Sequence, residues 1–183
     1  MERVIERLLS RKQEIFEGIS KESIAAYLFI QEQYAKGKTE DPLFRFVFCE
    51  FYQISDRFTT KEWRDYYFTL FQPTDISTLL KKLESIDGKL QFSYATKLIH
   101  TVDPTKPIYD SLVAKALRLP ACQNKQRFDY YIKTYALLIE IHAALLNDVR
   151  ISQIIAEFNK FNGTNIAPSK VLDFLIWQLG KLE

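Results

Sequence analysis

Glycine and proline are scarce in this chain of 183 residues, which contains 5 glycines and 6 prolines. Average usage would give about 13 glycines. Sandwiches and barrels need glycine at many tight turns, so this scarcity disfavours them. Hydrophobic residues make up 47% of the chain and charged residues 26%, which argues against disorder and against a coiled-coil rod. We expect an all-α protein.

Cysteine and histidine are also rare, at 2 residues each. Cys49 and Cys122 lie far apart and neither belongs to a CxxC pair, so the spacing of zinc ligands is missing. The sequence has no phosphate-binding loop, nucleophile elbow, HExxH motif or dinucleotide fingerprint. We therefore expect neither a metal nor a cofactor. Because Cys49 ends an apolar run, we expect its thiol to be buried.

The chain has no large excess of charge and no long apolar run. Its 25 basic and 23 acidic residues give a net charge of +2, too little to attract DNA or a membrane by total charge alone. No window reaches the ~18 apolar residues of a membrane span. The charged, amphipathic start at residues 1–7 is not a secretory signal. We expect a cytoplasmic protein without membrane contact.

Apolar residues recur at helical spacing through most of the sequence and predict a compact globule of eight or nine helices. Residues 4–34 form one helical stretch with a break at Ser20 or Lys21. We expect residues 43–55 to form a central helix, because five aromatic residues fall within nine positions and cover every side of it. The whole chain is one all-helical domain or two helical lobes. The remaining helices are expected at residues 60–70, 76–85, 92–102, 111–119, 126–146, 152–161 and 168–179, the last with one apolar face.

Residues 79–118 carry the information about function. They form a helix, a turn containing Gly88, a second helix, a proline-bounded loop, and Asp110 at the start of a third helix. A helix–turn–helix of this kind offers backbone N–H groups and a helix N-terminus to a phosphate. Residues 81–118 include seven basic and four acidic side chains, a local excess that supports DNA binding weakly.

Part of this segment resembles a known family. The run from Ala95 to His100, followed by Pro104 and the residues from Pro107 to Val113, resembles the helix-hairpin-helix DNA glycosylases, closest to their small 8-oxoguanine-glycosylase-like branch. In that family the hairpin grips the DNA backbone, and an aspartate shortly after it stabilises the transition state at the sugar. Bifunctional members add a lysine that forms a Schiff base with C1′. The resemblance implies base-excision repair of duplex DNA that carries a damaged base.

By this resemblance Asp110 is the catalytic aspartate. Cleavage of an N-glycosidic bond builds positive charge on the sugar, which a nearby carboxylate stabilises. Residues 91–93 stand where the family's lysine opens the helix, and none of them is a lysine, so lyase activity is not implied. The lysines left to assist are Lys97 and Lys89. The implied DNA contacts are Gly88, Lys89, Gln91, Ser93 and Lys106.

Simpler structural interpretations stand beside these assignments. Asp110 suits a helix N-cap, and Lys97 suits an exposed lysine over a packed stem. His100 suits a hydrogen-bonded, half-buried histidine. A further pattern, three tyrosines near basic residues, is typical of surfaces that stack and neutralise nucleic acid. That pattern comprises Tyr130, Tyr131 and Tyr135 with Lys125, Arg127 and Lys133.

Two alternatives to the enzyme therefore stay open. One is a noncatalytic helical module that binds nucleic acid, and the other is a protein-interaction module. The sequence names neither the base that is recognised nor the oligomeric state.

Overall fold

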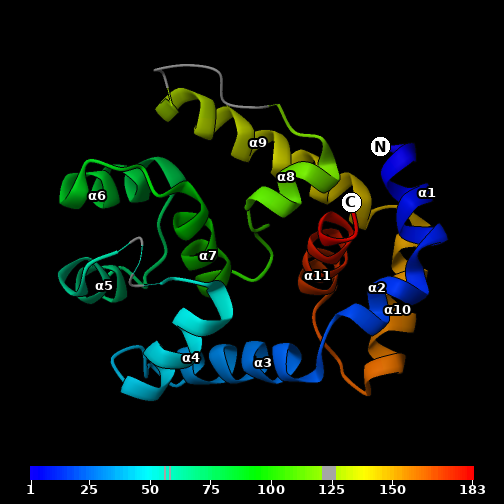
Figure 1. The fold of residues 1–183 in the computed structure, drawn as a ribbon, viewed down its shortest axis with the longest axis horizontal. Helices are drawn as coiled ribbons and strands as arrows, with labels where there is room; N and C mark the ends of the chain where they lie inside the picture. Colours follow the sequence, from blue (N-terminus) through cyan, green and yellow to red (C-terminus); the bar gives the residue numbers. More distant parts are fainter. Residues whose placement is uncertain (56, 58, 121–126) are drawn as a thin grey trace. The chain divides into compact units, whose positions relative to one another are not determined.

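The structure, a computed structural model, describes residues 1–55, 57, 59–120 and 127–183, and only the backbone of Arg127. Cys122 and Lys125 lie outside the described residues. Over the described ranges the chain forms 11 α-helices and no strand, which confirms the all-α class (Figure 1). The predicted number of eight or nine helices is too low. The first predicted stretch breaks at Arg11 as well as near Ser20, so residues 2–35 form three helices.

The helices cluster into two compact units, which are described separately. The first unit contains residues 1–20 and 104–183, and the second contains residues 21–103. The segment 79–118 is divided between them. Asp110 and Lys106 belong to the first unit, whereas Lys89 and Lys97 belong to the second.

Helix α11 is the central helix of the first unit. Of its 14 residues, 11 are buried, including Lys170 and Asp173. A helix buried on nearly every side differs from the single apolar face that the sequence predicts. The unit comprises α1 (Glu2–Ser10), α2 (Lys12–Gly18), α8 (Ser111–Leu117), α9 (Arg127–Leu146), α10 (Val149–Asn162) and α11 (Pro168–Lys181).

Helix α8 packs directly against α11, and Figure 1 shows the two side by side. Gly180 makes this close approach possible. A Cβ atom at Gly180 would lie 2.2 Å from the carbonyl oxygen of Leu112, far inside van der Waals contact. The contact is backbone against backbone, so a side chain at position 180 would push the two helices apart.

The second unit is built around aromatic side chains. Its helices are α3 (Lys21–Ala35), α4 (Pro42–Tyr52), α5 (Lys61–Phe68), α6 (Ile76–Asp87) and α7 (Phe92–Val102). The rings of Phe44, Phe48, Tyr67, Phe68 and Phe71 pack against one another, and most of the pairs meet edge to face. This cluster holds α4 and α5 together.

The expectation that residues 43–55 form a central helix is wrong. Phe44, Phe48 and Tyr52 are buried at i, i+4 and i+8, one stripe of α4. Phe46 lies on another side of the helix and is 64% exposed. Cys49 is half-buried rather than buried, because it too lies off the stripe.

Short polar side chains cap several helices close to the predicted helix starts. Thr60 accepts a hydrogen bond from the N–H of Trp63 at 3.2 Å, and Asp75 accepts one from Thr78 at 2.9 Å. Asp41, before Pro42, caps α4 in the same manner. These caps satisfy N–H groups that the first helical turn leaves without a backbone partner.

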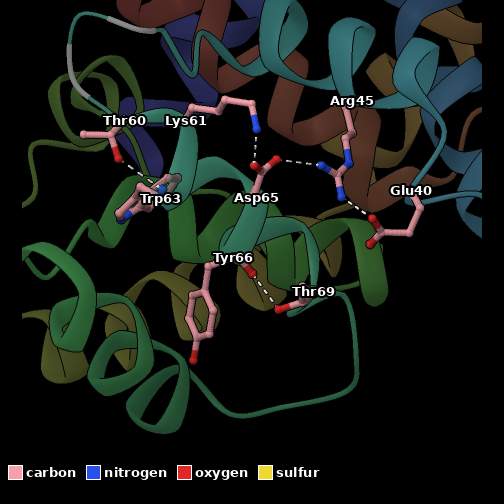
Figure 2. A network of polar contacts seen from close by, with 8 residues as sticks. All are labelled: Glu40, Arg45, Thr60, Lys61, Trp63, Asp65, Tyr66 and Thr69. Carbon is pink, nitrogen blue, oxygen red and sulfur yellow. Dashed lines mark hydrogen bonds and ion pairs between the residues drawn. The ribbon is translucent and has the colours of Figure 1, made fainter.

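A surface network of charges joins α4 to α5 (Figure 2). The carboxylate of Asp65 on α5 accepts from Lys61 one turn earlier at 2.7 Å and from Arg45 of α4 at 3.0 Å. Arg45 also pairs with Glu40, and its guanidinium lies 4.9 Å from the centre of the Phe68 ring. The bond with Lys61 is the main reason that the pKa of Asp65 is lowered. Because these groups face water, the network orients the two helices more than it stabilises them.

Candidate functional site around Asp110

The first turns of α11 bury three polar side chains, Ser169, Lys170 and Asp173. We call these three residues the polar face of α11. Two of them bind the backbone of residues 104–110, the loop that precedes α8. The hydroxyl of Ser169 donates to the carbonyl of Thr105 at 3.2 Å, and the carboxylate of Asp173 accepts from the N–H of Ile108 at 3.4 Å. The polar face thus supplies partners to loop backbone that has no helical ones.

Helix α9 supports the same loop from another side. The hydroxyl of Tyr135 donates to the carbonyl of Pro107 at 3.4 Å. His142, which is 2% exposed, places Nε2 3.6 Å from Oδ1 of Asp173. Helices α9 and α11 therefore hydrogen-bond loop 104–110 at three residues that precede Asp110: Thr105, Pro107 and Ile108.

Asp110 ends this loop and caps α8, which confirms its predicted N-cap position. Its backbone is extended, and Oδ1 accepts from the N–H of Val113 at 2.8 Å. The residue is half-exposed. Within the described part of the chain, Oδ2 accepts no hydrogen bond. One carboxylate oxygen is thus occupied by the helix, and the other is open to a ligand.

Lys170, the middle residue of the polar face of α11 in sequence order, is only 3% exposed. Its ammonium is 4.5 Å from the centre of the Phe174 ring. Burial lowers the pKa of Lys170 to about 8, and the negative charges of Asp173 and Asp110 act in the opposite direction. Burial is the larger of these influences, so the pKa of Lys170 stays below its ordinary value.

Tyr109, the residue before Asp110, interacts with two tyrosines of α9. Burial raises the pKa of Tyr109 to about 12, with smaller contributions from Tyr130, Tyr131 and the Asp110 charge. The rings of Tyr130 and Tyr131 meet edge to face at 5.4 Å. All three residues are half-buried.

The predicted tyrosine surface is correct only in part. Tyr135 is 4% exposed and belongs to the interior, since its hydroxyl binds the loop. Lys133 is exposed, whereas the side chains of Lys125 and Arg127 lie outside the description.

The turn between α6 and α7 has the predicted position in the second unit. Gly88 ends α6 at φ +70°, and Gln91 precedes α7 at φ +48°, a left-handed conformation that favours glycine. The carboxylate of Asp87 accepts from the N–H of Lys89 at 3.0 Å and from the amide of Gln91 at 3.1 Å. Asp87 therefore organises the turn and occupies one of its N–H groups. No side chain caps the N-terminus of α7.

The implied DNA-contacting residues differ in exposure. Gly88 and Lys89 are exposed, while Gln91 and Ser93 are half-buried at the same turn. Lys106 is half-buried in loop 104–110 of the first unit.

Lys97 is not the exposed lysine that the structural interpretation predicts. It is 8% exposed, and its ammonium donates to the carbonyl of Tyr52 at 2.8 Å and lies 5.2 Å from the Tyr94 ring. Tyr52 is the last residue of α4, whose final carbonyls lack helical donors. His100 is likewise fully buried rather than half-buried.

Sequence reasoning missed Lys170, Asp173 and His142. A signal for the first two was present, because Lys170 precedes and Asp173 interrupts the apolar pattern of residues 171–179, at a spacing of three that puts them on one side of a helix. A charged pair inside an otherwise apolar helix indicates a buried polar contact. Nothing in the pattern around His142 pointed to Asp173.

Comparison of the chain with protein-family models, with curated proteins and with solved structures finds no match. Among the described residues, no group of three or more His, Cys, Asp or Glu side chains is placed to hold a metal ion. None of the described helices has the length and apolar character needed to cross a membrane.

Proposed function

We propose that the protein is a cytoplasmic DNA-binding enzyme that cleaves the N-glycosidic bond of a damaged base, with Asp110 as the catalytic carboxylate. The setting of Asp110 carries this proposal. The residue is half-exposed, it ends a loop held by α9 and α11, and its Oδ2 is open to a ligand. A carboxylate held in this manner provides preorganised charge.

The chemistry needs a negative charge beside the sugar. As the bond between C1′ and the base nitrogen breaks, positive charge builds on the sugar ring, and the Asp110 carboxylate stabilises it. Water then adds to C1′, and its proton compensates the charge of the departing base. The base must leave the stack first, and the half-buried tyrosines Tyr109, Tyr130 and Tyr131 are the aromatic residues assigned to contact with a flipped base.

DNA backbone contacts are assigned to the turn at residues 88–91 and to Lys106. The left-handed residues Gly88 and Gln91 shape this turn, and the uncapped N-terminus of α7 offers N–H groups to a phosphate. Lys89 and Lys106 add attraction that depends on salt. Ser93, in the first turn of α7, is assigned to the same contact.

For cleavage of the N-glycosidic bond, hydrolysis by water is better supported than a lyase step through a lysine. A Schiff base needs a neutral lysine that reaches C1′. The ammonium of Lys97 is buried against the carbonyl of Tyr52, and Lys89 is exposed at the turn that follows α6. Either lysine would have to change its surroundings before it could attack.

The test uses duplex oligonucleotides that carry single damaged bases. We expect the wild-type chain to release a base and leave an abasic site, and Asp110→Asn to lower this rate at least about 100-fold. Asparagine caps helices almost as well as aspartate, so α8 should remain folded. The matched control is Asp75→Asn, which makes the same change at the N-cap of α6.

Each result separates the alternatives. Equal rates for Asp110→Asn and Asp75→Asn would contradict the role of Asp110. Salt-dependent binding without base release by the wild type would favour the noncatalytic module, and no binding would favour a protein-interaction module. Borohydride trapping of a covalent adduct that is lost in Lys97→Ala or Lys89→Ala would show a lyase step.

A further inference from the structure

His142 is a buried polar residue that the chemistry proposed above leaves unused. It lies near the end of α9 and is 2% exposed. Its Nε2 is closed off from water, and among the described residues no group forms a hydrogen bond with that atom. A buried polar atom without a hydrogen bond is costly, so the position of this ring nitrogen needs an explanation.

Asp173 of α11 provides that explanation. Helices α9 and α11 pack against each other, and Nε2 lies 3.6 Å from Oδ1 of Asp173. This distance is about 0.4 Å beyond the longest usual N–H···O bond. Oδ1 already acts as an acceptor, for the N–H of Ile108, so Nε2 must be the donor of this pair. The geometry therefore places a ring proton on Nε2.

The same carboxylate oxygen holds the loop that carries Asp110. Oδ1 of Asp173 accepts from the N–H of Ile108 at 3.4 Å, two residues before Asp110. Nε2 of His142 and the N–H of Ile108 thus converge on one oxygen. A carboxylate that attracts two donors from different sides is less free to rotate away from either of them.

We propose that His142 is a positioning residue, whose Nε2 proton orients the Asp173 carboxylate and thereby fixes the loop that presents Asp110. This inference rests on the proposed function. Helix α9 then acts on the loop at two points, because Tyr135 also donates to the carbonyl of Pro107 at 3.4 Å. A shift of the loop would move Asp110 away from the sugar, where a displacement of about 1 Å is enough to slow a reaction.

Lys170 also acts on Asp173, but it sets the direction of the carboxylate less strictly. The charge of Asp173 favours the protonated form of Lys170. An ammonium on a flexible stem attracts a carboxylate from many directions, whereas an imidazole N–H points along one line. The other charged groups of this unit are exposed or paired elsewhere: Lys115 and Glu140 are exposed, and the printed pairs are Arg7 with Glu183, Arg11 with Glu14, Lys12 with Glu157, and Arg150 with Glu2 and Asp148.

The first measurement asks which nitrogen of His142 carries a proton. The chain has only 2 histidines, so a proton–nitrogen correlation spectrum of the imidazole rings contains two sets of signals. We expect Nε2 of His142 to be protonated and its proton resonance to move upfield in Asp173→Asn, which removes the charged acceptor. His100 belongs to the other unit and is the reference that should not move. An unprotonated Nε2 in the wild type would overturn the proposal.

The second measurement is amide hydrogen exchange at Ile108 in the full chain. His142→Phe keeps a ring but removes the donor, and we expect it to speed exchange at Ile108 about tenfold. His142→Gln should stay near the wild-type rate, because its side-chain amide offers an N–H group. The reference is the amide of Leu175, which is buried in α11 and reports opening of the whole unit. Equal acceleration at Ile108 and Leu175, or no change at Ile108, would overturn the proposal.

The third measurement is base release from the damaged duplexes. We expect His142→Phe to lower kcat about tenfold without a similar change in KM, and His142→Gln to keep most of the wild-type rate. Glu140→Gln, an exposed change on the same helix, should alter neither value. A wild-type kcat in His142→Phe would show that the contact does not position Asp110.

Failure of the proposed function and failure of this inference are distinguishable. No base release by the wild type would refute the proposed function, while the ring spectrum and the exchange at Ile108 would still decide whether His142 holds the loop through Asp173. If His142→Phe does not fold, the protonation of Nε2 in the wild type and its response to Asp173→Asn decide.

Discussion

At the scale of single residues, the burial of a lysine in this protein is explained by the groups that its ammonium contacts. Lys97 and Lys170 are both buried, but Lys97 donates to a helix-terminal carbonyl, whereas the ammonium of Lys170 lies over the ring of Phe174. The sequence predicts neither arrangement. Tyr52 lies 45 residues from Lys97, and the surroundings of Lys170 depend on how α8 packs against α11. The N-cap position of Asp110 was predictable, since capping depends on the next three residues alone.

The contact between Lys97 and Tyr52 predicts a stability difference between two lysines of the same segment. Lys97→Met should lower the free energy of unfolding by about 1–3 kcal/mol, because the buried carbonyl of Tyr52 loses its donor. Lys89→Met, at an exposed position, should change it by no more than about 0.5 kcal/mol. Urea unfolding of the two variants and the wild type measures both values. Equal effects would show that the bond to Tyr52 adds nothing to stability.

At the scale of the helices, boundaries were more predictable than burial. Thr60, Asp75 and Pro42 mark helix starts through local chemistry, and the structure places helices there. Which helix becomes central depends on neighbours that are distant in sequence. Five aromatic residues favoured residues 43–55, yet in the second unit α7 is the more buried helix, and in the first unit α11 is buried by contacts with α1, α2, α8, α9 and α10.

The contact between α8 and α11 predicts unequal costs for two glycine substitutions. Gly180→Ala places a methyl group against the Leu112 carbonyl and should destabilise the protein by about 1–3 kcal/mol, despite the better helix propensity of alanine. Gly18→Ala meets only the end of the Gln178 side chain, which can rotate away, so its cost should stay below about 1 kcal/mol. Thermal and urea unfolding of both variants checks the order. A Gly180→Ala protein as stable as the wild type would contradict the close approach of α8 and α11.

At the scale of the whole molecule, the buried ionisable groups set how stability depends on pH. The pKa of Lys170 is about 8 in the folded chain, below its ordinary value of 10.5. Between these values the unfolded chain binds more protons, so stability rises with pH. Tyr109 acts in the opposite direction. Its pKa is raised to about 12 from an ordinary 10, so between these values the folded chain binds more protons and stability falls as the pH rises. The combined contribution of these two groups should therefore be most favourable near pH 10.

Comparison with Lys170→Met isolates the lysine, since the tyrosines contribute equally to both proteins. Below about pH 8 Lys170 is protonated in the folded and unfolded chains, so the difference in unfolding free energy between wild type and variant should be constant there. From pH 8 to pH 10 that difference should move in favour of the wild type by about 2–3 kcal/mol. Urea unfolding at closely spaced pH values measures it. Parallel stability curves across this range would mean that burial does not disfavour the charged form of Lys170, and the ammonium would then be solvated rather than enclosed by α8 and α11.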